Sequence, residues 1–412
     1  MYKITLGATA LALIATTATS GGIERSSNDY GFLFTPGSVF NLGHAIVTPS
    51  VSGEYTAALG GGSTGNMSRS YGTFSFAAKH DLSDKLAIGL YHNQAYGANA
   101  AYAQGVYTGL TADWQSKQTS LILKYQLADR VSVFGGMRYV LSKADITIPE
   151  LLIRNAVGNY ATDLAAQASA AAMAGDLATA AELGARATTL GTAVSPLANP
   201  LGDPGLNYSA NGAQTGDFGY TLGVAYEIPD IALRVALTYE SAVTHAFDTF
   251  EMLPTLGIGG NGTTEITMPQ SLALDFQTGI AAGTLLFGGV KWTEWSAWEV
   301  RTPGYESVTG DEITGFANDV VTWKLGVGKQ FNDNYSAFAQ ITYEAPDDEV
   351  ASRLAPTDGR TSLGLGGQFT EGPHKLRVGM EYVKLGDATD STGVQFKDNS
   401  AWGVGVSYTA SF

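Results

Sequence analysis

Along most of this chain, large apolar side chains recur at every second residue, and this period constrains the fold more than any other feature. In the closing stretch AWGVGVSYTASF, residues 401–412, one parity carries the Trp, Val, Tyr and Phe residues, and the other carries only Ala, Gly, Ser and Thr. A two-residue period places these two sets on opposite faces of a β-strand. The sequence therefore predicts strands with one apolar face and one small or polar face.

Runs of this kind follow one another along the chain, and the connections between them alternate strictly between short and long. The short ones, such as LADR at 127–130 and FNDN at 331–334, have the composition of tight turns. This alternation is typical of up-and-down outer-membrane barrels, with periplasmic turns on one rim and external loops on the other. The fourteen predicted strands are 39–52, 68–80, 84–96, 111–127, 130–148, 215–228, 231–246, 264–280, 284–299, 317–331, 334–345, 358–369, 373–386 and 396–412.

The two faces of the strands indicate the medium. If the small and polar parity, which includes Arg234 and Arg377, faced a core, that core would be poorly packed and would bury charge. Turning the apolar face to lipid and the polar face to a lumen removes both difficulties. No run of eighteen apolar residues offers a helical span, so a closed barrel is the remaining way into a membrane. We expect an all-β, 14-stranded antiparallel transmembrane β-barrel over 38–412, in preference to a soluble two-layer β-protein.

The aromatic residues support the same orientation. Phe412 lies on the outward parity of the last strand and resembles the signal by which the barrel assembly machinery recognises its substrates. That strand must close against the first one, because an open edge is not tolerated in lipid. Further aromatic residues near strand ends fit an interfacial girdle, and these are Trp292, Trp295, Trp298, Trp323, Trp402 and Tyr408.

The N-terminal residues divide into two parts. Residues 1–20, MYKITLGATALALIATTATS, have a basic start, an apolar run and a small-residue cleavage site, as a secretory signal peptide does. Residues 21–37, GGIERSSNDYGFLFTPG, mix charges with an apolar stretch. Fourteen strands enclose more space than their side chains fill. We therefore expect 21–37 to fold inward as a short luminal plug.

One segment departs from the strand pattern. The Ala-rich residues 159–191 are interrupted by Gly175, and Asp176 can cap a second helix that begins at Leu177. This predicts a helical hairpin within the longest external loop, about 149–214. The hairpin could roof the barrel or receive an apolar ligand, and the alternative is a decoration without function.

Composition argues against several classes of protein. The chain has no Cys. Its formal charge of −15 disfavours nucleic acid as a partner, because the phosphates would be repelled. Its five His residues show no metal-binding spacing. Ser241 and His245 share a strand face about 13 Å apart, too far for a nucleophile and its base. We expect no catalytic residues, no metal site and no cofactor, and hence no enzyme.

Four stretches of the second half resemble the FadL/TodX-type family, the outer-membrane transporters of long-chain fatty acids and other hydrophobic compounds. They are TMPQSLALDF at 267–276, KWTEWSAW at 291–298, NDVVTWKLGVGKQF at 318–331 and PTDGRTSLGLGGQF at 356–369. Their order fits that family from about residue 264 to the end, and fourteen strands fit as well. The family's longer N-terminal hatch and its Asn-Pro-Ala motif are missing, so its hatch chemistry is not carried over.

The resemblance implies passive uptake of hydrophobic or amphipathic small molecules, such as long-chain fatty acids, across the bacterial outer membrane. It also implies sideways release through a gap near the third strand. In LYHNQAYGANAAYAQG, residues 90–105, the alternation fails beyond His92, and Gly97 indicates a kink or bulge. We expect the gap at His92 and Gly97, and the alternative is an ordinary strand that runs into a loop.

The lumen parity carries both charged and apolar side chains, a mixture that suits a ligand with an apolar tail and an anionic head. The tail would gain about 25 cal/mol per Å² of buried area, and an Arg would bind the head. For each charge the alternative is a structural Arg–Glu pair across the wall. The predicted ligand contacts are Phe134, Arg138, Arg234, Phe338 and Arg377.

Two other functions stay open at this point. An outer-membrane lipid hydrolase would need a Ser–His pair at the lipid face, and a general diffusion porin would need a wide open lumen. For the transporter we expect a monomer surrounded by outer-membrane lipid and lipopolysaccharide, with a hydrophobic small molecule as its ligand.

Overall fold

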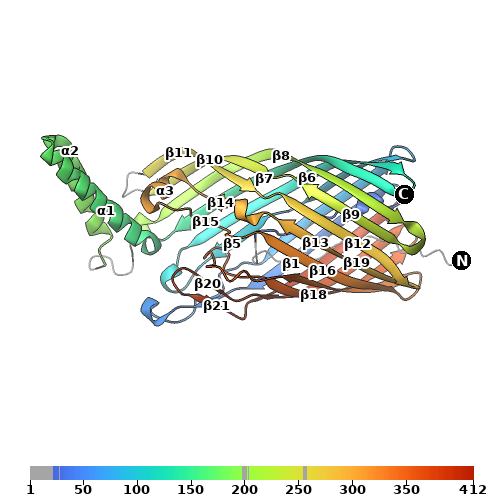
Figure 1. Ribbon diagram of the computed structural model, residues 1–412. Coiled ribbons are helices and arrows are strands. Elements are labelled where there is room, and N and C mark those ends of the chain that lie inside the picture. Colours follow the sequence, from blue (N-terminus) through green and yellow to red (C-terminus); the bar gives the residue numbers. More distant parts are fainter. Residues whose placement is uncertain (1–21, 27, 197–201, 203, 254–257) are drawn as a thin grey trace.

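The computed structural model describes residues 22–26, 28–196, 202, 204–253 and 258–412. They form a closed antiparallel β-barrel of fourteen strands, as predicted (Figure 1). Residues 1–20, the predicted signal peptide, lie outside the described residues. The barrel strands are β1 (Val39–Ser50), β3 (Tyr71–Asp81), β4 (Leu86–Asn93) continued by β5 (Gly97–Ala101), β6 (Thr111–Ala128), β7 (Val131–Ile148), β8 (Tyr208–Ile228), β9 (Leu233–Glu240) continued by β10 (Val243–Leu253), β11 (Ile258–Met268) continued by β12 (Ser271–Ala281), β13 (Thr284–Thr293), β16 (Val320–Gln330), β17 (Tyr335–Glu344), β18 (Arg360–Glu371), β19 (His374–Leu385) and β22 (Ser400–Ser411).

The first and last strands close the barrel. β22 pairs with β1 from Val39 opposite Ser411 to Ser50 opposite Ser400. Its other edge pairs with β19, and β1 pairs in turn with β3. No edge of β22 is therefore left unpaired, as a lipid environment requires.

The connections divide between the two ends of the barrel. The tight turns and the C-terminus lie at one end, and the longer connections lie at the other (Figure 1). The longer connections contain most of the short elements. These are β2 (Gly53–Glu54), β14 (Glu299–Val300), β15 (Thr314–Gly315), β20 (Ala388–Thr389), β21 (Gln395–Phe396), α1 (Glu150–Met173), α2 (Leu177–Ala193), α3 (Pro303–Thr309), η2 (Ala57–Leu59), η3 (Gly105–Tyr107), η4 (Pro204–Leu206) and η7 (Trp295–Ala297), while η1 (Gly31–Phe34) precedes β1 and η5 (Pro229–Ile231) forms a turn.

α1 and α2 form the predicted helical hairpin, which projects away from the barrel (Figure 1). Gly175 turns the chain with a φ of +83°, and the Asp176 carboxylate accepts a hydrogen bond of 3.1 Å from the Thr179 amide. The predicted cap at Asp176 is thus confirmed, although α1 already begins at Glu150. None of the helices in the described residues is both long and apolar enough to cross a membrane.

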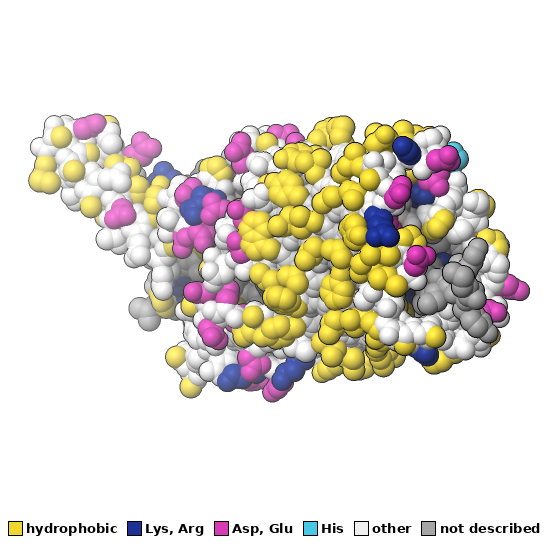
Figure 2. Space-filling model, turned by 45° about the vertical axis from the view of Figure 1, so that its right-hand side comes forward, with side chains coloured by type: hydrophobic (Ala, Val, Ile, Leu, Met, Phe, Trp, Pro, Cys, Tyr) yellow, Lys and Arg dark blue, Asp and Glu magenta, His cyan; other side chains and the backbone are white. Residues whose placement is uncertain are grey.

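The outer wall of the barrel is apolar. Along β22, Trp402, Val404 and Val406 are exposed, while the intervening residues face inward and are buried. A band of apolar side chains crosses the visible face between two zones that carry most of the charged ones (Figure 2). Inward-facing Arg138 and Glu381 are only 1% and 4% exposed. The inverted polarity expected from the sequence is present.

Two Trp residues assigned to the girdle lie inside the barrel instead. Trp323, Trp402 and Tyr408 are exposed on the outer wall, as a girdle requires. Trp295 and Trp298 are 2% and 5% exposed and pack among luminal residues. The chain leaves β13 after residue 293, and η7 turns both rings inward. Their position near the end of a predicted strand suggested the girdle, but both lie beyond the end of β13.

Candidate functional site

The N-terminal segment, residues 22–26 and 28–38, enters the lumen and contacts the wall where the third strand is interrupted. The Arg25 amide donates to the Ala95 carbonyl at 2.8 Å, and the Gly97 amide donates to the Ile23 carbonyl at 2.8 Å. Further along, Tyr30, Phe32 and Leu33 are almost fully buried against wall residues. The segment therefore occupies one side of the lumen.

A buried carboxylate of the wall fixes this segment by hydrogen bonds. Glu240, at the end of β9, accepts from the Asn28 amide at 2.7 Å and from the Tyr30 phenol at 2.5 Å. Arg138 of β7 lies 3.6 Å from the same carboxylate. Nearer the external end, Lys291 of β13 pairs with Glu24 at 2.6 Å. Charged groups of the segment and of the wall thus compensate each other where water is scarce.

Above the segment lies an apolar cavity of about 70 Å³. Trp114 of β6 stacks edge-on against Phe247 of β10 at 5.5 Å and against Trp298 at 5.8 Å, and Trp298 contacts Phe316 at 5.2 Å. Residues of β14, β15 and the 346–357 loop contribute to the lining from the external side. No Lys or Arg is among the lining residues, whereas Asp113 is. This cavity, called the apolar cavity below, suits an uncharged apolar molecule.

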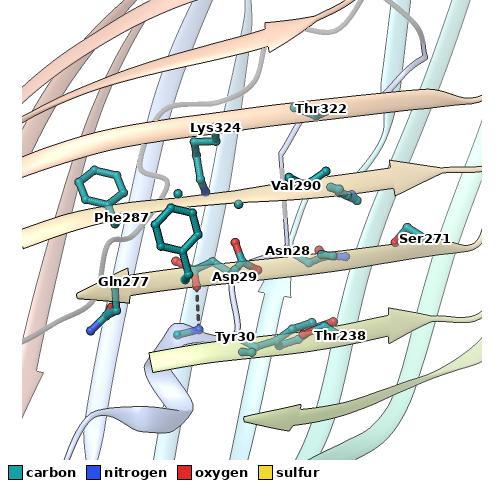
Figure 3. A pocket seen from close by; sticks show the side chains of 18 of the residues that line it. Asn28, Asp29, Tyr30, Thr238, Ser271, Gln277, Phe287, Val290, Thr322 and Lys324 are labelled. Carbon is teal, nitrogen blue, oxygen red and sulfur yellow. Dashed lines mark hydrogen bonds between the residues drawn. The ribbon is translucent and has the colours of Figure 1, made fainter. Parts of the chain in front are cut away.

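A second cavity, of about 120 Å³, lies between the segment and strands β9, β12, β13 and β16 to β19 (Figure 3). Its lining carries charges of both signs, among them Asp29, Asp275 and Lys324. Figure 3 shows Asn28, Asp29 and Tyr30 on one side, with Gln277 and Lys324 approaching from the strands. This polar cavity shares no lining residue with the apolar cavity.

The hydrogen-bonded ladder of the wall is interrupted at the third strand, where the sequence predicted a gap. The ladder between β3 and β4 ends where Phe76 pairs with His92, and β5 pairs with β6 rather than returning to β3. A side cavity of about 280 Å³ lies here, lined by polar residues that include Arg25 and Lys117. The Arg25 guanidinium rests 4.0 Å from the centre of the Tyr71 ring. Arg25 therefore lies across the interruption from inside.

His92 and Gly97, the residues predicted at a gap, lie on either side of the interruption between β4 and β5. His92 ends the paired part, stacks on Phe76 at 5.3 Å, and shares a hydrogen bond of 2.9 Å with Thr119. Gly97 begins β5, and an added Cβ there would clash with the Arg25 side chain in its present position. A side chain at this position would therefore require Arg25 to move.

Three of the five predicted ligand contacts lie beside the N-terminal segment. Phe134 is 4% exposed, lines the polar cavity, and meets Phe34 edge-on at 5.8 Å. Arg234 also lines the polar cavity and stacks over the Phe34 ring at 4.7 Å. Arg138 lines neither the apolar nor the polar cavity, because its guanidinium donates to the Ser241 carbonyl at 2.6 Å and to Gln118 at 2.9 Å. Arg138 also lies 3.6 Å from the Glu240 carboxylate, as the alternative of a structural pair expects.

The other two predicted contacts form a separate pair. The Arg377 guanidinium lies 5.7 Å from the centre of the Phe338 ring and donates to Gln368 at 2.8 Å. Neither residue lines the apolar or the polar cavity. The sequence did not predict the four aromatic residues of the apolar cavity, which are Trp114, Phe247, Trp298 and Phe316. The available signal was the pair of Trp residues in KWTEWSAW, interpreted above as a girdle.

One hydrogen-bonded chain has the connectivity of a hydrolase triad. His245 of β10 bonds Asp217 at 2.8 Å through Nδ1 and Ser142 at 3.0 Å through Nε2. Ser142 is 1% exposed, is also bonded to Ser116 at 2.7 Å, and lines neither the apolar nor the polar cavity. A nucleophile must reach its substrate. The arrangement therefore supports the wall between β7, β8 and β10 rather than a reaction.

The comparison with known families accounts for this combination of a closed barrel and an apolar luminal cavity. The outer membrane protein transport family (OMPP1/FadL/TodX) matches residues 33–412. The chain belongs to this family. Its members are transport channels of the bacterial outer membrane for hydrophobic compounds, not enzymes, and this chain is accordingly a multi-pass outer-membrane barrel.

Solved structures of the same fold cover almost the whole chain. A Pseudomonas aeruginosa FadL homologue aligns with a TM-score of 0.67 at 12% identity, over 97% of this chain and 99% of its own. The Pseudomonas putida toluene transporter TodX aligns at 0.60 and 12% identity, over 96% of each chain. The Ralstonia pickettii toluene transporter TbuX aligns at 0.57 and 13% identity, over 97% of each. No curated protein sequence matches the chain.

Proposed function

We propose that this protein takes up small uncharged apolar molecules and holds them in the apolar cavity on their way into the outer membrane. The observation that carries the proposal is the cluster of four rings, Trp114, Phe247, Trp298 and Phe316, without a Lys or Arg in the lining. Aromatic edges and faces contact a hydrocarbon closely. Each Å² of apolar surface removed from water contributes about 25 cal/mol to binding.

Long-chain fatty acids fit this cavity less well than hydrocarbons do. No Lys or Arg belongs to its lining, so the cavity offers no partner for the carboxylate head of a fatty acid. Two of the similar structures are those of toluene transporters, and toluene is an uncharged ligand. We therefore place an aromatic hydrocarbon ahead of a fatty acid as the transported compound.

We further propose that the ligand leaves sideways through the gap beside His92 and Gly97, with Arg25 as its inner cover. In this arrangement the N-terminal segment is a luminal plug that narrows the barrel without filling it. The protein works as a monomer surrounded by lipid and lipopolysaccharide. Phe412, 82% exposed at the end of β22, is the contact offered to the barrel assembly machinery.

A substitution that fills the apolar cavity tests the proposed function. Ala144 of β7 lines this cavity, whereas Ala246 of β10 faces outward and is exposed. Ala144→Trp should lower the uptake of radiolabelled toluene by intact cells about tenfold, because the added indole occupies the site. Ala246→Trp, inserted at equal level in the outer membrane, should leave uptake unchanged. Equal uptake by Ala144→Trp and the unsubstituted protein would overturn the proposal.

A further inference from the structure

We propose that the polar cavity is a hydrated lane that conducts small inorganic ions past the N-terminal segment, alongside the route for apolar molecules. This activity goes beyond the proposed function, because the two cavities share no lining residue. Apolar molecules and ions would then cross the lumen by separate routes, on different sides of the N-terminal segment.

The first observation is the length of the polar cavity along the barrel. Its lining includes four successive inward positions of β12, from Ser271 through Ala273 and Asp275 to Gln277. Six residues of strand rise by about 20 Å. Arg360, at the external end of β18, and Arg234, near the turn that precedes β9, extend the lining in both directions. The cavity therefore follows most of the membrane-spanning wall instead of forming a local pocket.

The second observation is that the lining contains polar groups that only water can satisfy. Oδ2 of Asp29 and Oε1 of Gln277 are buried and have no hydrogen-bond partner in the protein. Lys324 forms no hydrogen bond or ion pair with another described residue, although it projects toward the segment that carries Asp29 (Figure 3). Asp275 is exposed, although its side chain lines the lumen. Buried polar atoms without a partner are costly, and ordered water is the usual remedy.

The third observation is the distribution of charge along the lane. Glu24 and Lys291 neutralise each other at its external end, and Glu240 is tied to the segment. Asp29, Asp275 and Lys324 also line the cavity, together with Arg234, Arg360 and Glu381. Side chains that line a narrow passage set the ion selectivity. Because charges of both signs line the passage, it should discriminate only weakly between cations and anions. Replacing the positive charge of Lys324 by a negative one should make it favour cations.

The experiment measures the ion conductance of the purified, intact protein in planar lipid bilayers bathed in potassium chloride solution. The unsubstituted protein should show a small, steady conductance. Ala273→Trp, which places an indole in the lane, should lower it about tenfold. Ala144→Trp in the apolar cavity and Ala246→Trp on the outer wall should leave conductance unchanged. Lys324→Glu should shift the reversal potential in a salt gradient toward that of a cation-selective pore.

The outcomes separate this proposal from the proposed function. Ala273→Trp should take up toluene normally while conducting poorly, and Ala144→Trp should show the reverse. A protein that takes up toluene but conducts no ions would overturn the lane and leave the uptake function standing. Conductance that neither Ala273→Trp nor Lys324→Glu alters would overturn it as well. If Ala273→Trp does not assemble, the reversal potential of Lys324→Glu decides alone.

Discussion

The phenol of Tyr30 donates a hydrogen bond of 2.5 Å to the carboxylate of Glu240, joining the N-terminal segment to the end of β9. The Asn28 amide reaches the same carboxylate at 2.7 Å, and Arg138 lies 3.6 Å away on β7. A single buried carboxylate therefore connects the segment to two strands of the wall. This contact adds to the backbone hydrogen bonds and the Glu24–Lys291 pair that also hold the segment.

Removing the phenol should loosen the segment. Tyr30→Phe loses a hydrogen bond to a charged acceptor, which should cost about 1.5–3 kcal/mol of local stability. Amide hydrogen exchange of residues 28–34 should accelerate accordingly, and the small ion conductance should rise. Tyr343→Phe, at an exposed position of the outer wall, is the matched control. Unchanged exchange in Tyr30→Phe would show that this hydrogen bond does not hold the segment.

Arg25 should control release through the gap in the wall. Its guanidinium lies over Tyr71 at 4.0 Å, inside the opening between β3 and β5. Arg25→Ala should remove this cover and speed the transfer of a hydrocarbon into lipid vesicles about threefold, if opening limits the rate. Arg353→Ala, which removes an Arg stacked over Tyr107 in the external loops, serves for comparison. An unchanged transfer rate in Arg25→Ala would place the exit elsewhere.

Asp113 should help to select uncharged ligands. Asp113 belongs to the linings of both the apolar and the side cavity, and its carboxylate accepts a hydrogen bond of 2.9 Å from Gln115. Asp113→Asn removes a like charge from the path of a carboxylate head, worth about 1 kcal/mol at a hydrated site. The affinity for a fatty acid should rise about fivefold, while that for toluene stays constant. Binding of both ligands can be followed by quenching of Trp fluorescence, and an equal change for both would contradict selection by charge.

The external loops should weaken at alkaline pH. Burial, followed by the hydrogen bond that it donates to Asp390, raises the pKa of Tyr107 to about 12 from its ordinary value near 10. Because the folded pKa is the higher one, this stabilisation is complete below pH 10 and is lost as the pH rises toward 12. The difference between tyrosinate absorbance titrations of the unsubstituted protein and Tyr107→Phe should therefore have its midpoint near 12. A midpoint near 10 would show that Tyr107 ionises freely.

The barrel could be predicted because its determinants are local. The alternation that predicted a strand over 396–412 is present in β22, and the turn residues near 331–334 separate β16 from β17. Where the inward-facing parity changes at an interruption, the end of the strand was predicted too early. The seventh strand continues beyond 246 as β10 to Leu253, after a break at 241–242 that separates it from β9.

The site could not be predicted in the same way, because its parts meet only when the barrel closes. Trp114 comes from β6, Phe247 from β10, and Trp298 from a connection that follows β13. Their sequence separations carry no common period. Arg138 shows a different limit of prediction. Its parity correctly placed it inside the barrel, but parity could not show that its guanidinium donates hydrogen bonds to Ser241 and Gln118.

The hairpin of α1 and α2 stands clear of the barrel, and at its tip Met173 and Leu177 are 85% and 71% exposed (Figure 1). A Cβ added at Gly175, between the two helices, would meet no other atom within 4 Å. A foreign peptide inserted at that glycine would therefore be displayed outside the cell on a helical stalk, away from the transport machinery in the barrel.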